Sequence, residues 1–285
     1  MTGVQTCVFR SLLLYISFFY AQFLPEASIT TFTFNIYNSI TADLGGVFSH
    51  IWSICVEEQF YLFWPILLIC TNYKNHMKLC VVIVFFSLSL RFYFALANWE
   101  HYSIINYRLT PVCLDSFGLG ALLAISKIRN GQLLKNILQK SFIPLIFFVM
   151  YLFQSFYKLP VWVSEVLLRF EVSVCSFFII GNALFGFNGK LGVFLASNWV
   201  SYIGKISYGI YLYHLAISYF LDPYLSQFWD FLFKESNSIL KYNSFILKFP
   251  VYFFFTVTLA SFSFEYFEKQ FLFYKKKLEI RWNRL

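Results

Sequence analysis

Two adjacent carboxylates and an amide stand in an otherwise apolar run of the sequence. The run is His50–Ile69, HIWSICVEEQFYLFWPILLI, and its central polar members are Glu57, Glu58 and Gln59. An ionisable side chain at membrane depth costs about 2.5–3.5 kcal/mol, so such residues are rare and commonly functional. The pattern predicts a membrane-spanning helix that carries a polar site. The alternative is a helix end at the interface whose carboxylates are hydrated and idle.

Helix geometry separates the two carboxylates. Ser53, Glu57 and Tyr61 share one face at i, i+4, i+8 spacing, whereas Glu58 points about 100° away. The two groups therefore cannot serve the same proton. We expect one carboxylate to face a cavity and the other to anchor the helix to a neighbour.

A second group of polar residues lies in SYIGKISYGIYLYHLAI, near the end of the chain. Ser207, Tyr211 and His214 fall near one helix face, and Tyr208 adds a further hydroxyl. Imidazole ordinarily titrates near neutral pH, which makes His214 the natural proton carrier and a candidate catalytic residue. A hydrogen-bonded packing histidine is the alternative.

Further charged residues are buried in apolar runs, where an unpaired charge is costly. Arg108 and Asp115 are candidates for an outer gate or an ion pair. Arg169 and Glu171 are two residues apart and face different directions, so we expect each to bind another helix. The remaining members of this set are Arg91 and Glu265.

The elements that position these residues are predicted to be membrane helices. Hydrophobic residues make up 59% of the 285 residues and charged residues only 13%, against about 25% in soluble domains. We predict an all-α polytopic protein with about eight spans, each long enough to cross about 30 Å of hydrocarbon. The spans are Phe9–Leu24, Ile51–Thr71, Leu79–Trp99, Leu109–Ser126, Phe142–Tyr157, Val163–Phe187, Tyr202–Leu221 and Phe245–Phe267.

The basic residues predict the orientation of these spans. Lys and Arg concentrate in alternate loops and in the tail after Phe267, whereas the intervening loops carry the acidic residues. By the positive-inside rule the basic set is cytoplasmic, which places both termini in the cytoplasm. The net charge of +8 is thus explained by topology, and nucleic acid is not predicted as a partner.

No metal site or bound cofactor is predicted. The six cysteines are dispersed without a CxxC pair or a Cys/His cluster, and neither a P-loop nor a GxGxxG motif is present.

Four motifs in order resemble the membrane-bound acyltransferase 3 family. The family's WSLSVEEQFYLLWP signature is similar to Trp52–Pro65, and its IGKISYGLYLWH segment is similar to Ile203–His214. Arg108–Ala124 resembles the R-x-D…G-x-L-x-A segment with a longer spacing. Glu268–Phe271 resembles the closing E-[KR]-P-F, with Gln in place of Pro.

The resemblance implies transfer of an acyl group, expected to be acetyl, from cytoplasmic acyl-CoA to a hydroxyl of a cell-surface glycan or related acceptor. It implies a location in the bacterial inner membrane, with the lipid bilayer, acyl-CoA and the acceptor as partners. From polarity and motif position we expect Glu57, Glu58 and His214 to act in catalysis, although neither His50 nor His214 aligns with the family's catalytic His. Substrate contacts are expected from Trp52, Ser53, Gln59, Tyr61, Arg108, Asp115, Ser207, Tyr208 and Tyr211.

The family pattern also begins earlier than this sequence does. The resemblance places two helices, the family's catalytic His and a donor-binding Arg element before residue 8, so an N-terminally truncated copy is expected. Residues 1–7, MTGVQTC, resemble a translated sequencing adapter and are expected not to be native. We treat 1–285 as one integral-membrane domain. A transporter or flippase for glycan or lipid, and a scaffold without catalysis, remain the alternative classes.

Overall fold

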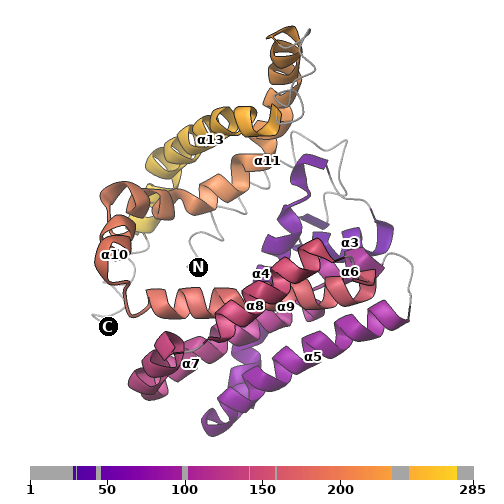
Figure 1. The fold of residues 1–285 in the computed structure, drawn as a ribbon, viewed down its shortest axis with the longest axis vertical. Helices are drawn as coiled ribbons and strands as arrows, with labels where there is room; N and C mark the ends of the chain where they lie inside the picture. The colour runs from indigo at the N-terminus through magenta and orange to yellow at the C-terminus, as the bar shows by residue number, and fades with distance from the viewer. Residues whose placement is uncertain are drawn as a thin grey trace. The chain divides into compact units, whose positions relative to one another are not determined.

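The computed structural model describes residues 28–29, 31–42, 46–97, 102–140, 142–157, 159–232 and 244–274. Every regular element in these ranges is helical (Figure 1). The chain divides into two compact units. One comprises residues 31–44 and 51–192, and the other comprises residues 1–30, 45–50 and 193–285. The division falls within the short helix α10, Gly189–Leu195.

The larger unit contains most of the helices. In chain order they are α3 (Phe34–Thr41), α4 (Ile51–Cys70), the 3-10 turn η2 (Tyr73–Asn75), α5 (His76–Leu96), α6 (Tyr102–Arg108), α7 (Thr110–Lys140), α8 (Ile143–Phe156) and α9 (Val161–Ala183). Helix α7 packs between α5 and α9, and α8 covers α9 (Figure 1). The short helices α3 and α6 pack against α4 and against each other.

Glycine sets the close approach of α5 and α7. A Cβ on Gly118 would lie 2.9 Å from a methyl of Val84 and 3.1 Å from the Cys80 carbonyl oxygen. Only a residue without a side chain allows this spacing, as small residues do in membrane helix pairs. The approach brings α7 close enough for its polar residues to meet those of α5.

The smaller unit is built on two long helices. It contains the 3-10 turn η1 (Gly46–Phe48), α11 (Asn198–Leu232), α13 (Ser244–Ser263) and a π-helical turn, Phe264–Glu268, labelled η3. Helices α11 and α13 pack side by side (Figure 1), with Gly209 against Ala260, where a Cβ would lie 3.1 Å from the Ala260 Cβ. The turn η1 packs against α11.

Seven of the eight predicted spans coincide with helices α4, α5, α7, α8, α9, α11 and α13. The first, Phe9–Leu24, lies outside the described residues. Within the described part, four stretches are long and apolar enough to cross a membrane: Ile51–Cys70, Tyr73–Leu96, Ser103–Gln139 and Val166–Ala183. Helix α8 is apolar but shorter. The described part of the chain is therefore all-helical, and the protein is a multi-pass membrane protein.

Two predicted loops are wrong because they are helical. The segment after Ser126 was expected to be a basic loop, yet α7 continues to Lys140 across a single non-helical residue, Asn130. Leu134 and Leu138 bury themselves against Leu123 and α9, which holds this extension in place. The Asn130 side chain accepts a hydrogen bond from the Leu133 amide and so starts the second part of the helix.

The other correction concerns the outer loop expected from Asp222. Helix α11 runs through Asp222 and Pro223 to Leu232. The Asp222 carboxylate binds protein groups: its Oδ1 accepts hydrogen bonds from Lys248 Nζ at 3.0 Å and from the Tyr252 hydroxyl at 2.6 Å. Both donors come from α13, so the pairing joins the two helices where a loop was expected.

Candidate functional site

Helix α4 carries the glutamate pair and begins with a buried face. Ile51, Ile54, Cys55 and Val56 are buried, and Val56 packs on Val112 and Cys113 of α7. The adjoining residues Trp52, Ser53, Glu57 and Glu58 are half-buried. The apolar face thus fixes the helix against α7 and holds both carboxylates at the edge of the packed core.

Gln59 is engaged with protein atoms at both ends of its amide. Its Nε2 donates to the Phe32 carbonyl at 2.6 Å and to Asn35 Oδ1 at 2.9 Å, and its Oε1 accepts from the Thr110 hydroxyl. Asn35 is fully buried and donates in turn to Thr110 Oγ1 at 2.8 Å. Both amide protons of Gln59 are therefore committed to α3 and the segment before it, and its amide oxygen is committed to Thr110 of α7.

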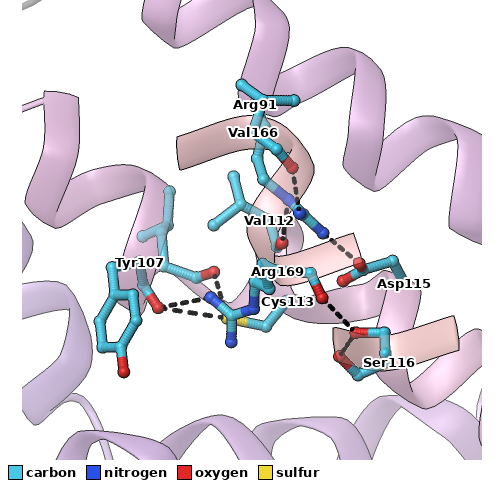
Figure 2. Close-up of polar contacts among 10 residues, drawn as sticks. Arg91, Tyr107, Val112, Cys113, Asp115, Ser116, Val166 and Arg169 are labelled. Atoms are coloured by element: carbon cyan, nitrogen blue, oxygen red, sulfur yellow. Dashed lines mark hydrogen bonds and ion pairs between the residues drawn. The ribbon is translucent and has the colours of Figure 1, made fainter. Parts of the chain in front are cut away.

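A buried ion pair lies at the centre of the larger unit. Arg91 of α5 pairs with Asp115 of α7, and both side chains are 0% exposed (Figure 2). Arg91 Nε donates to the Val112 carbonyl and its Nη1 to the Val166 carbonyl, each at 3.0 Å. The pair thereby links α5, α7 and α9. Substrate contact with Asp115 would require breaking this pair.

Of the two alternatives for Arg108 and Asp115, an outer gate or an ion pair, the ion pair is wrong. Asp115 lies one turn into α7 and reaches back to α5, whereas Arg108 ends α6 and approaches the Trp52 ring, with its guanidinium carbon 6.0 Å from the ring centroid. The partner of Asp115 is Arg91, and sequence spacing alone could not select Arg91 from the other intramembrane charges.

Arg169 approaches the same tryptophan from α9. Its guanidinium carbon lies 5.8 Å from the Trp52 centroid and 5.5 Å from that of Tyr107, and its Nη1 donates to the Tyr107 carbonyl at 2.6 Å (Figure 2). The Trp52 and Tyr107 rings are 5.1 Å apart. Glu171, two residues on, accepts instead from Gln154 of α8. The prediction that Arg169 and Glu171 bind different helices is confirmed.

In the smaller unit, two histidines and a tyrosine meet. The His50 and His214 ring centroids are 5.1 Å apart, and the His50 and Tyr211 centroids are 5.3 Å apart. The Tyr211 hydroxyl donates to the His50 carbonyl at 2.8 Å, and His50 Nε2 donates to the Leu212 carbonyl at 3.2 Å. Sequence reasoning did not place His50 in a site, since its partners lie more than 160 residues away.

The hydrogen bond of His214 fixes its tautomer. Nδ1 lies 2.6 Å from the Tyr211 carbonyl oxygen, which can only accept, so Nδ1 carries the proton. In the neutral ring Nε2 is then unprotonated and able to accept a proton. This is the state that a general base requires.

His214 lines a pocket between α11 and α13. The pocket has a volume of about 520 Å³, and its lining includes Ser207, Tyr211, Tyr252 and Thr256. The expectation that Ser207, Tyr211 and His214 share one face is therefore confirmed, while Tyr208 is not among the lining residues. The pocket is large enough for a small acyl or glycosyl group.

His50 is held in its neutral form. Burial, and to a lesser extent the charge of His214, lower the pKa of this imidazole to about 4. At neutral pH His50 therefore contributes no charge beside His214.

The predicted site residues fall into two groups. Trp52, Ser53, Glu57, Glu58, Gln59, Tyr61, Arg108 and Asp115 belong to the larger unit, and Ser207, Tyr208, Tyr211 and His214 belong to the smaller one. The structure adds Arg169 to the first group and His50 to the second. In the sequence, Arg169 was singled out only as a charge within an apolar run, and His50 was not singled out.

Comparison with known proteins gives the family. A family model described as an acyltransferase domain, acyltransferase 3, matches residues 7–264. Provisionally named O-acetyltransferases of Staphylococcus aureus strains COL, MSSA476 and MRSA252 are each 27% identical over 190 residues. The matches cover 61% of this chain and 30% of each relative, so the chain spans under a third of their length. No solved structure matches the chain.

The family model covers most of the chain and includes the glutamate pair of α4 and the histidine of α11. The chain therefore belongs to the acyltransferase 3 family.

Proposed function

We propose that the protein transfers an acyl group, in the first instance acetyl, from cytoplasmic acyl-CoA to a hydroxyl of a cell-surface glycan or related acceptor. The observation that carries the proposal is the state of His214 in its pocket. The hydrogen bond from Nδ1 to the Tyr211 carbonyl leaves Nε2 as a proton acceptor beside a cavity of about 520 Å³. The name of the Staphylococcus aureus relatives supports acetyl as the group transferred.

The reaction replaces a thioester bond by an ester bond. The acceptor oxygen attacks the thioester carbonyl carbon, the hydroxyl proton passes to a base, and the carbon–sulfur bond breaks. The released thiolate takes up a proton, so one hydroxyl proton ends on the CoA sulfur. His214 Nε2 is the proposed base, and the Ser207 and Tyr211 side chains in the pocket are the proposed hydrogen-bond donors to the substrates.

The larger unit contributes the remaining proposed roles. Glu57 and Glu58 are half-buried carboxylates that orient an acceptor hydroxyl or an imidazole. Trp52, Ser53 and Tyr61 of α4, together with Tyr208 of α11, are proposed to contact the substrates. Gln59 and Asp115 are proposed to act indirectly, because their polar groups are already bound to the protein.

The proposed setting is the bacterial inner membrane, with about eight spans and both termini in the cytoplasm. The alternation of basic and acidic loops supports this orientation. In this proposed orientation the start of α4 and the end of α6 lie on the outer side, where a surface glycan arrives, and the basic loops lie on the side of acyl-CoA.

A transfer assay tests the proposal. The full reading frame around this chain is purified in nanodiscs and supplied with acetyl-CoA labelled in the acetyl group and with a surface glycan. Label should appear covalently on the glycan. We expect His214→Gln to reduce the rate by about 10²-fold or more, as loss of a general base does.

The matched control is His76→Gln. His76 caps the end of α4 through hydrogen bonds to the Leu68 and Thr71 carbonyls and lies in the other unit, so its replacement should leave the rate unchanged. Vesicle flux of glycan without covalent labelling would instead favour the transporter class. Wild-type rates in His214→Gln would remove His214 from the mechanism.

A further inference from the structure

Three arginine side chains of the larger unit, Arg108, Arg129 and Arg169, have no carboxylate partner among the described residues. Asp115 neutralises Arg91. Arg108 and Arg169 instead lie against the Trp52 ring, at 6.0 Å and 5.8 Å from its centroid. Residues of α4, α6 and α9 therefore place two positive charges around one indole.

Arg108 is the more telling of the two residues. Arg108 is only 8% exposed, and its Nη1 is buried without a hydrogen-bond partner in the described part of the chain. Contact with an aromatic face offsets only part of the cost of burying a guanidinium. A buried donor that the protein leaves unpaired indicates a group that arrives from outside.

Arg169 is partly exposed and keeps donors available. One nitrogen, Nη1, donates to the Tyr107 carbonyl (Figure 2). The rings of Tyr107 and Trp52 also lie against the guanidinium and hold it in place. A guanidinium presents five donors in a planar fork that suits the two oxygens of a carboxylate or phosphate. Trp52 thus orients two guanidinium groups, those of Arg108 and Arg169, which are suited to bind an oxyanion.

We propose that Arg108, Arg169 and Trp52 form a binding site for an oxyanion, carboxylate or phosphate, carried by the acyl acceptor. This assignment rests on the proposed function, because it makes the acceptor of that reaction an anionic molecule. Acyl-CoA is not the proposed source of the anion. Arg108 and Trp52 follow loops that the charge pattern predicts to be outside, whereas acyl-CoA approaches from the cytoplasm.

The experiment measures binding and needs no acyl transfer. The full reading frame is placed in nanodiscs of phosphatidylcholine, which has no net charge, and titrated calorimetrically at low salt. The probes are methyl glucuronide, glucose 6-phosphate and the neutral methyl glucoside. We expect at least one charged sugar to bind at least tenfold more tightly than the neutral sugar.

Matched variants localise the preference. Arg108→Gln and Arg169→Gln should each reduce it to threefold or less. Arg129→Gln should retain it, because Arg129 makes a comparable contact with the Tyr73 ring, 4.7 Å from its centroid, away from Trp52. Arg108→Gln removes an unpaired buried charge, so its thermal unfolding temperature should equal or exceed that of the wild type. Should that variant fail to fold, Arg169→Gln decides alone.

Three results would overturn the proposal: equal affinity for charged and neutral sugars, a preference that survives in both variants, or loss of the preference in Arg129→Gln. A preference that disappears when phosphatidylglycerol is added would assign the anion to a lipid headgroup and overturn the acceptor as its source. Failure of the acyltransferase proposal is distinguishable, since charged sugars would then bind without being acylated.

Discussion

The imidazole rings of His50 and His214 meet edge to face, with centroids 5.1 Å apart, although one precedes α4 and the other lies within α11. Both rings donate to consecutive carbonyls of the same helix turn, His214 to Tyr211 and His50 to Leu212. His214 Nδ1 and His50 Nε2 therefore donate to backbone carbonyls and not to the other imidazole ring. His50 therefore positions the turn that holds His214, and it does so as a neutral group.

The burial of His50 predicts acid sensitivity of the smaller unit. Its pKa falls from 6.5 to about 4 on folding, so the unfolded chain binds more protons between these values. The contribution of neutral His50 to stability is complete above pH 6.5 and is lost as pH falls toward 4, by about 3 kcal/mol in total. Chemical unfolding of the purified protein at pH 7 and pH 4.5 measures this loss.

His50→Gln separates titration from hydrogen bonding. Glutamine retains a donor for the Leu212 carbonyl but does not titrate, so the variant should lose less stability than the wild type on acidification. An equal loss of stability on acidification in His50→Gln and in the wild type would show that other groups cause the acid sensitivity.

The glutamate pair should matter for transfer and not for expression. Glu57→Ala and Glu58→Ala should each reduce acceptor acylation by about tenfold or more, because a hydrogen bond to a charged group contributes roughly 1.5–3 kcal/mol. Glu265→Ala is the control, since Glu265 forms an exposed i,i+4 pair with Lys269 that has little energetic weight. Labelled acetyl transfer at equal membrane protein levels is the measurement, and full activity in both variants would refute these roles.

Gln59 should behave as a structural clamp. Gln59→Ala leaves the buried Asn35 and the Phe32 carbonyl without their donor, which should cost about 2–4 kcal/mol of unfolding free energy. Combining it with Thr110→Val should give a coupling energy of at least about 0.5 kcal/mol. The control is Gln132→Ala, whose amide contacts only exposed Asn136. Additive effects of the first two changes would contradict a shared network.

The length of apolar runs predicted most helices, because an apolar segment of about 20 residues has few alternatives to a helix. The same criterion failed after Ser126 and at Asp222, where charge was taken as the end of a helix. At both places the charge is tolerated for a reason remote in sequence. Leu134 and Leu138 pack on α9, and Lys248 of α13 pairs with Asp222.

The site could be predicted in kind but not in pairing. Polarity inside apolar runs singled out Arg91, Arg169 and Asp115 as interhelical groups, and the i, i+4, i+7 spacing placed Ser207, Tyr211 and His214 on one face. Which arginine neutralises Asp115 depends on the approach of α5 to α7 at Gly118. His50 carried no such signal, since its ring meets residues more than 160 positions away.

The Arg91–Asp115 pair should be costly to break and cheap to replace. Asp115→Leu leaves the fully buried Arg91 guanidinium without its counter-charge, so the free energy of unfolding should fall by about 3–5 kcal/mol. The double variant Arg91→Met with Asp115→Leu removes both charges and should recover most of that loss. Denaturant unfolding in the same detergent compares the wild type, both single variants and the double variant.

The exposed pair of Lys269 with Glu265 provides the contrast, since Lys269→Ala should barely change unfolding. A double variant as unstable as Asp115→Leu would mean that the Arg91 bonds to the Val112 and Val166 carbonyls, rather than the charge balance, hold α5, α7 and α9 together. Recovery of stability with lost acyl transfer would instead show that the pair is retained for placing Arg169 and Trp52 beside α7.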